Sequence, residues 1–114
     1  MNIISTMIEA HIFRETEKGI QFLLLKRSEG QPYPSLWQMV TGKIKANEKA
    51  FQTALREIKE ETGLVPVQLW VAPTANSFYE PKDEYIYLLP VFAARVETDL
   101  VKLSDEHTEF QWTD

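Results

Sequence analysis

The segment from Asn47 to Thr62 constrains the fold most strongly, because its apolar and acidic residues form two separate stripes at helical spacing. Apolar residues that recur three and four positions apart are typical of a helix with one buried face. Asn47 is a good N-cap, and Gly63 is placed to end the helix in a left-handed conformation. We therefore predict a helix over 47–62 that packs its apolar stripe against a sheet. That stripe consists of Phe51, Ala54, Leu55 and Ile58.

Strand patterns lie on both sides of this helix. The first two runs are rich in β-branched and apolar residues, and the polar turn at 14–19 between them predicts a hairpin. Gly30, Pro32 and Pro34 indicate a loop over 28–35. One amphipathic helix among several strands predicts either an α+β domain or an α/β domain with a mixed sheet. We expect strands at 3–13, 20–25, 36–41, 67–72, 85–96 and 110–112, with 73–83 part strand and part loop.

Composition narrows the classes of function. A chain of 114 residues fits a single domain, 1–114. The absence of cysteine excludes disulfides, zinc–thiolate sites and thiol nucleophiles, and with only two histidines a metal site would be built mainly from oxygen. The net charge of −5 argues against a nucleic-acid polymer as partner. The N-terminus lacks a signal-peptide pattern and no apolar run reaches membrane-spanning length, so we expect a cytoplasmic protein without a membrane partner.

The acidic stripe of the predicted helix has two interpretations. Glu57, Glu60 and Glu61 stand at positions i, i+3 and i+4, where their like charges destabilise an isolated helix. Arg56 and Lys59 could relieve a merely solvated acidic face, which is what most charge runs are. Alternatively, clustered carboxylates suit a hard cation such as Mg²⁺ or Mn²⁺. Spacing alone favours the solvated face.

The residues around the stripe reverse that preference. From Gly42 to Leu64 the chain reads Gly, five residues, Glu, seven residues, Arg-Glu, an aliphatic, any residue, Glu-Glu, any residue, Gly and an aliphatic. This sequence, residues 42–64, resembles the box of the Nudix hydrolase family. The run at 36–41, residues 103–107 and Trp112 are also similar to the family. The matching box positions are Gly42, Glu48, Arg56, Glu57, Ile58, Glu60, Glu61, Gly63 and Leu64.

The resemblance implies an α/β/α sandwich in which a mixed sheet carries the box helix on one face. It implies a pyrophosphohydrolase whose cofactor is Mg²⁺, with Mn²⁺ as an alternative. Arg56 would orient the carboxylates, and Glu48 would be its structural partner. A carboxylate of the box or of a loop would accept a proton from water. The metal ligands would be Glu57, Glu60, Glu61 and the Gly42 carbonyl.

Outside the box, several residues are candidates for ligand contact. Glu106 is either a further metal ligand or a solvated loop acid, and His107 is either an acid–base group or a structural histidine. Arg27 is our preferred phosphate contact. Lys43 is either a second phosphate contact or an exposed lysine that serves solubility. Trp37 could stack on a base or belong to the core. Phe78 and Tyr79 could also stack on a base. Glu80, Asp83 and Glu84 are interpreted as a solvated loop.

The substrate predicted from the resemblance is a small phosphorylated compound, and we leave a homodimer open. The run Trp37 to Gly42 is similar to members that act on dihydroneopterin triphosphate, so a pterin or nucleoside triphosphate comes first. Dinucleoside polyphosphates are an alternative substrate. A second alternative is that the chain is a non-catalytic module that has the same fold and binds nucleotides.

Two departures from the family pattern stand out. Residues 45–47 read Lys-Ala-Asn, where many members have an acidic residue and then glycine; Asn47 tolerates left-handed geometry, so we expect the turn to survive. The family usually adds another helix after the region of Trp112, and this sequence ends at Asp114, so we expect the C-terminal helix to be missing.

Overall fold

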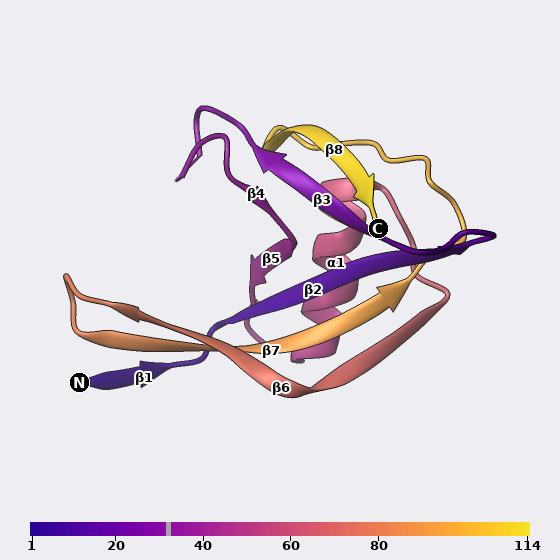
Figure 1. Ribbon diagram of the computed structural model, residues 1–114. Helices are drawn as coiled ribbons and strands as arrows, with labels where there is room; N and C mark the ends of the chain where they lie inside the picture. Colours follow the sequence, from indigo (N-terminus) through magenta and orange to yellow (C-terminus); the bar gives the residue numbers. More distant parts are fainter. Residues whose placement is uncertain (32) are drawn as a thin grey trace.

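A computed structural model describes residues 1–31 and 33–114 (Figure 1). Pro32, one of the residues that predicted a loop, lies outside the described residues. Within them the chain forms eight strands and one helix. These are β1 (Asn2–Ile4), β2 (Met7–Thr16), β3 (Gly19–Arg27), β4 (Trp37–Gln38), β5 (Val40–Lys43), α1 (Ala50–Thr62), β6 (Gln68–Glu80), β7 (Tyr85–Arg95) and β8 (His107–Thr113).

The strands form one mixed sheet, which confirms the α/β prediction. Strand β7 runs parallel to both β1 and β2, and the remaining pairs are antiparallel. The hairpin of β2 and β3 is present, as predicted. Strands β6 and β8 extend the sheet by pairing with β7 and β3.

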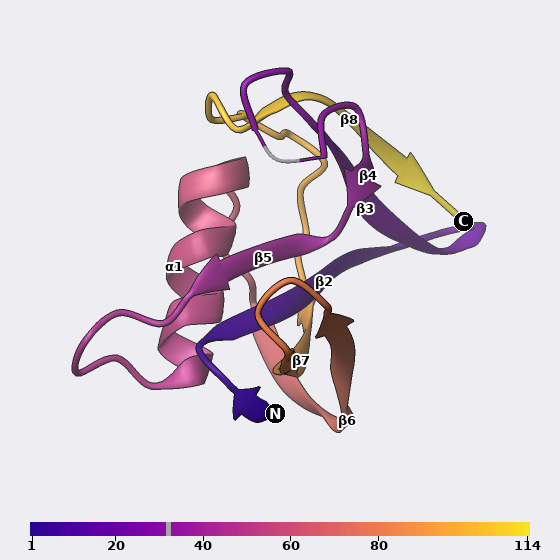
Figure 2. The same ribbon diagram turned by 90° about the vertical axis from the view of Figure 1, so that its left-hand side faces the viewer.

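One edge of β2 pairs with two different strands, one after the other along its length. Residues 7–10 of β2 pair with β5, whereas residues 13–16 pair with β3. Strands β3 and β8 therefore diverge from β5, as Figure 1 shows. Helix α1 packs on one face of the sheet, against β5, β2 and β7 (Figure 2). At 13 residues, α1 is too short to cross a membrane, and no other helix occurs in the part of the chain that is described.

The core lies between this face and α1. Alternate residues of β2, namely Ile8, Ala10 and Ile12, are fully buried. Ala10 lies opposite Val40 on β5 and Phe92 on β7, which are buried with it. Because side chains alternate along a strand, this burial fixes the register and sends the odd-numbered residues of β2 to the other face. The helix contributes Ala54 and Ile58 to the same core.

The helix begins later than predicted. It starts at Ala50 with Lys49 at the N-cap, so the prediction of Asn47 as N-cap was wrong. Instead, Asn47 has a positive φ of 65° in a turn where Lys45 O accepts a hydrogen bond from Glu48 N. The competing principle is turn formation, because Asn favours left-handed positions as well as caps. The predicted stop is confirmed, since Gly63 has a φ of 74° and donates to Lys59 O.

The predicted apolar stripe was partly wrong. Ala54 and Ile58 are fully buried, but Phe51 and Leu55 are 44% and 37% exposed. The buried face of α1 is rotated relative to the prediction, and its remaining places are taken by polar residues. Pattern counting that considers only apolar residues misses this rotation. The polar residues on the buried face are Thr53, Glu61 and Thr62.

Several strand boundaries also differ from the prediction. The expected strand at 3–13 is divided into β1 and β2, and the run at 36–41 into β4 and β5. The segment 73–83, expected to be partly loop, is strand as far as Glu80. Its pairing with β7 is irregular between Val71 and Ala75, around Pro73, which has no N–H to donate to the ladder.

Candidate functional site

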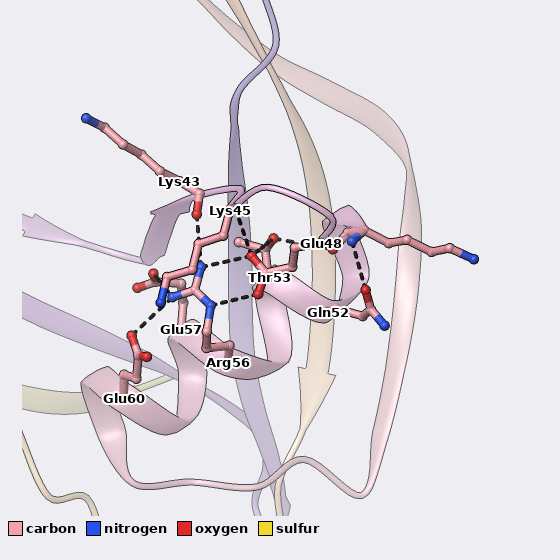
Figure 3. Close-up of polar contacts among 9 residues, drawn as sticks. Lys43, Lys45, Glu48, Gln52, Thr53, Arg56, Glu57 and Glu60 are labelled. Carbon is pink, nitrogen blue, oxygen red and sulfur yellow. Dashed lines mark hydrogen bonds and ion pairs between the residues drawn. The ribbon is translucent and has the colours of Figure 1, made fainter.

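Arg56, in the middle of α1, is the centre of a polar network that joins the helix to the loop before it (Figure 3). Its Nε and Nη2 atoms donate to the two carboxylate oxygens of Glu48, at 2.8 and 3.0 Å. Its Nη1 atom donates to Glu57 at 2.6 Å and to Glu60 at 3.2 Å. Arg56 thus contacts Glu48, its expected partner, through a fork, and the same guanidinium also holds the carboxylates of Glu57 and Glu60.

Glu48 joins the loop before α1 to the helix itself. Besides Arg56, its Oε1 atom accepts hydrogen bonds from Thr53 Oγ1 at 2.6 Å and from Lys45 N at 3.0 Å. The hydrogen bonds from Arg56 and then Thr53 hold the pKa of Glu48 well below its usual range. Arg56 also donates from Nη2 to Lys43 O at 2.9 Å, so the end of β5 is tied to the same network.

Gly42 lies directly beneath the side chain of Glu57. A Cβ atom at residue 42 would stand 2.3 Å from Glu57 Cγ and 2.4 Å from its Cδ, distances that no real contact allows. Glycine therefore lets the Glu57 carboxylate pass close to the backbone of β5. This contact brings β5, which carries the Gly42 carbonyl, close to the carboxylates of α1.

Glu61 is a buried acid whose charge is not balanced by the groups around it. Its side chain is 3% exposed, and among the described residues Oε2 has no hydrogen-bond partner. Burial, followed by a hydrogen bond to Glu57 and the charges of Glu57 and Glu106, raises the pKa of Glu61 to about 10, against a smaller opposing effect of Arg27. A carboxylate in this setting is stabilised by a bound cation.

The loop before β8 and the first residue of β8 bring two further side chains, Glu106 and His107, to Glu61. Ser28 holds this loop, because its N and Oγ atoms both donate to Glu106 O, at 2.9 and 3.1 Å. In Figure 2 the loop lies over the end of α1, where Ser104 N donates to Glu61 O. Ligand atoms of Glu61, Glu106 and His107 all lie within 4.8 Å of one another.

The donors present fit a divalent cation. Oxygen atoms of Glu57, Glu61 and Glu106 are the ligands that Mg²⁺ prefers, and the unpartnered Glu61 oxygen is a position that a cation would satisfy. The predicted ligand Glu60 is placed differently. Its side chain is 54% exposed, and it contacts Arg56 at the rim of the network.

A cleft of about 690 Å³ opens beside these acids. The two predicted phosphate contacts, Arg27 and Lys43, both line it. Trp37 does not; it lies on β4 with 38% of its surface exposed. The full lining consists of Met7, Glu9, Arg27, Gln31, Tyr33, Gln38, Thr41, Gly42, Lys43, Glu57, Asn76, Phe78, Leu89 and Glu106.

Several polar residues of the cleft were not predicted from sequence, among them Glu9 and Asn76. Asn76 Nδ2 donates to Glu9 Oε1 at 2.9 Å, which joins β6 to β2 at the cleft wall. His11 Nε2 lies 2.7 Å from the other carboxylate oxygen of Glu9. A signal for Glu9 was available, because it is the one acidic residue within the predicted strand 3–13. Asn76 gave no such signal, since its strand was expected to be part loop.

Burial of Glu61 leads to a prediction about pH. Because the pKa of Glu61 is raised from 4.5 to about 10, the folded chain keeps a proton that the unfolded chain releases between those values. Without metal, the stabilising effect of the protonated form should be complete below about pH 4.5 and be lost as pH rises toward 10. In chelator, Glu61→Gln should therefore melt above the wild type, by a margin that widens from pH 5 to pH 9.

Thermal unfolding of both proteins across this pH range measures the margin. Exposed Glu97 provides the control, because Glu97→Gln makes the same chemical change without burial. Mg²⁺ should raise the melting temperature of the wild type more than that of Glu61→Gln. A Glu61→Gln protein that melts below the wild type at pH 9 contradicts the account of Glu61.

The chain is similar to proteins of a known family. The family described as NUDIX domain matches residues 7–114. An asymmetrical bis(5'-nucleosyl)-tetraphosphatase from Caenorhabditis elegans is 32% identical, over 89% of this chain and 72% of its own length. A dihydroneopterin triphosphate diphosphatase from Haemophilus influenzae is 27% identical, over 85% of this chain and 67% of its own length.

Solved structures support the same grouping. The structure of a MutT protein from Methanosarcina mazei Go1 is 34% identical, with a TM-score of 0.75, and covers 98% of this chain and 77% of that protein. The relatives are longer than this chain. Three other curated relatives are matched over only 22%, 63% and 30% of their lengths.

Proposed function

Because the chain belongs to the NUDIX family of pyrophosphohydrolases, we propose that it hydrolyses a diphosphate linkage in a nucleoside- or pterin-triphosphate-type substrate with Mg²⁺ as cofactor. The observation that carries this proposal is the cleft, in which Glu57 and Glu106 stand together with the cations Arg27 and Lys43. A site with both signs of charge suits a polyanionic chain that is bound jointly by a metal and by basic side chains.

The residues that would hold Mg²⁺ are Glu57, Glu61, Glu106 and the Gly42 carbonyl, with Glu60 at the rim. When bound, Mg²⁺ offsets phosphate charge and lowers the pKa of the attacking water. Buried Glu61 and rigidly held Glu57 keep their oxygens in place without rearrangement. In this proposal, one of the site's carboxylates accepts the proton that water loses.

Arg27 and Lys43 serve the phosphates in this proposal. Arg27 ends β3 and Lys43 ends β5, so the two cations approach the cleft from different strands. Arginine can donate two parallel hydrogen bonds to one phosphate, whereas lysine acts as a point charge. Neutralising the leaving group in this way lowers the barrier to breaking the phosphoanhydride bond.

The rest of the cleft suits a heterocycle. Met7, Phe78 and Leu89 supply apolar surface, and Phe78 is held in place by stacking on Tyr87, with ring centroids 4.9 Å apart. Glu9 and Asn76 supply a hydrogen-bond acceptor and a donor on the wall. Such a mixture of apolar surface and a few polar groups is typical of small-molecule sites.

A dinucleoside polyphosphate is the second candidate substrate. The observation that favours it is the 32% identity to the Caenorhabditis elegans tetraphosphatase. The products distinguish the two candidates. A triphosphate gives a monophosphate and pyrophosphate, whereas an asymmetrically cut dinucleoside tetraphosphate gives a mono- and a triphosphate without pyrophosphate.

A product screen with Mg²⁺ tests the proposal. Nucleoside triphosphates, dihydroneopterin triphosphate and dinucleoside tetraphosphates should be incubated with the protein and separated by anion-exchange chromatography. Pyrophosphate formation from a triphosphate supports the first candidate. Binding of these compounds without any turnover would instead support a non-catalytic module and contradict the proposal.

Arg56→Lys should lower turnover by at least about tenfold, because lysine cannot contact Glu48 through a fork and reach Glu57 at the same time. The loss should appear mainly in kcat, since Arg56 holds ligands rather than substrate. Steady-state kinetics and melting curves measure it.

Lys59→Arg is the matched control, because Lys59 is exposed on the same helix. This substitution exchanges the same two residue types in the opposite direction. Its effect on kcat should be small. Equal and small effects of both substitutions would show that Arg56 is merely a solvated ion-pair partner.

A further inference from the structure

His107 has an unusual environment for a histidine that the proposed reaction does not use. Its side chain is fully buried, and among the described residues its Nδ1 atom has no hydrogen-bond partner. Buried polar atoms normally find a partner, so this nitrogen requires an explanation. Nδ1 lies 3.7 Å from Oε1 of Glu61, whose other oxygen is also without a partner.

The distance suits two ligands of one cation better than a direct hydrogen bond. A hydrogen bond from Nδ1 to the carboxylate would need a separation of about 2.7–3.2 Å, which is shorter than the one observed. Two atoms bound to the same divalent cation, each at about 2.1 Å, are about 3–4.2 Å apart, depending on the angle at the metal. The separation of 3.7 Å falls within that interval, and Glu106 completes the cluster.

The other ring nitrogen of His107 is already engaged. Nε2 lies 3.2 Å from the side-chain amide nitrogen of Gln38, a residue that also lines the cleft. Turning this amide by half a rotation preserves its shape and presents its oxygen to an Nε2–H group. Nδ1 then keeps its lone pair free, which is the usual arrangement of a metal-binding histidine and its supporting residue.

We propose that His107 Nδ1 is a metal ligand and forms a mixed imidazole–carboxylate cation site with Glu61 and Glu106. The inference rests on the proposed function in that Glu61 and Glu106 are taken as ligands. It adds a nitrogen donor to an otherwise oxygen-only site. Imidazole favours Mn²⁺, Co²⁺ and Zn²⁺ over Mg²⁺, so the chain should bind these cations more tightly than carboxylates alone would.

The first experiment uses the fact that the chain has only two histidines. In His11→Asn, His107 is the single histidine, and His11 lies on the face of β2 opposite the core residues. The untagged variant is labelled with ¹⁵N-histidine, and long-range ¹H–¹⁵N spectra are recorded with and without Zn²⁺. Zn²⁺ should shift Nδ1 to a metal-bound position while Nε2 stays protonated. An Nδ1 that remains protonated in saturating Zn²⁺ overturns the proposal.

The second experiment measures selectivity. His107→Asn replaces the ring nitrogen by an amide, and calorimetry compares Mn²⁺ with Mg²⁺ binding to wild type, His11→Asn and His107→Asn. The preference for Mn²⁺ should fall at least about tenfold in His107→Asn alone. An unchanged preference contradicts the nitrogen ligand. If His107→Asn does not fold, the spectra of His11→Asn still decide.

Hydrolysis with Mg²⁺, assayed in parallel on the wild type, separates the two proposals. Turnover together with a protonated Nδ1 in Zn²⁺ refutes only the histidine ligand. Nitrogen coordination without turnover of any substrate refutes only the proposed function.

Discussion

Glu61→Gln is expected to lower Mg²⁺-dependent turnover by at least about a hundredfold, the scale of losing one strong electrostatic contribution to a transition state. The substitution keeps the size of the side chain and removes its charge. Glu61 is buried beside Glu57, Glu106 and His107, so no neighbouring water can replace it easily. Steady-state rates at saturating Mg²⁺, with the substrate found in the screen, measure the loss.

Glu97→Gln is the control, because Glu97 is exposed outside the cleft, and its rate should stay near that of the wild type. The combination of outcomes for Glu61→Gln is distinctive. The variant should melt higher than the wild type without metal and yet be nearly inactive with it. A stable variant that retains a third or more of the activity would remove Glu61 from the catalytic machinery.

Gly42→Ala should lower turnover about as much as Glu61→Gln does, although it adds only one carbon atom. Its Cβ would lie 2.3 Å from Glu57 Cγ, so the side chain of Glu57 must move. Arg56 holds that carboxylate at 2.6 Å, and its displacement disturbs the network in Figure 3. A misplacement of about 1 Å at a reacting centre can cost about a hundredfold in rate, and we expect a loss of that order.

Gly30→Ala is the matched control, since a Cβ at residue 30 meets nothing within 4 Å. Turnover, Mg²⁺ affinity and the far-ultraviolet circular dichroism spectrum should be measured for both variants. Gly42→Ala should keep the wild-type spectrum and lose turnover and Mg²⁺ affinity together. Activity within threefold of the wild type would show that Glu57 needs no close approach to β5.

The sequence predicted the helix well because several local signals agree there. Gly63 ends the helix where expected, and Arg56 contacts Glu48 as the resemblance to the Nudix box implied. The start was misplaced because asparagine suits both an N-cap and a left-handed turn, and periodicity does not distinguish them. Similarly, Phe51 and Leu55 fit the helical period, but only tertiary packing determines that Thr53 and Glu61 face inward in their place.

The rest of the site depends on contacts between distant parts of the chain. Glu9 and Asn76 meet only because β2 and β6 flank β7, and no spacing in the sequence encodes that pair. The environment of His107 depends in the same way on Gln38 and Glu61. Sequence pointed to the carboxylates of one helix and, through the family resemblance, to Arg27, Lys43 and Glu106, which line the cleft. It did not point to the long-range pairs that complete the site.

The pairing of β8 with β3 has a consequence for synthesis on the ribosome. Translation delivers α1, and with it Glu57 and Glu61, long before the loop that carries Glu106 and leads into β8 at His107. That loop is fastened by Ser28, on the segment after β3, so its closure is a long-range step that follows release of β8 from the exit tunnel. A nascent chain halted after β7 would therefore display the acidic side chains of α1 without the residues that complete the proposed cation site. Chelator-sensitive protease resistance should arise only once β8 has emerged.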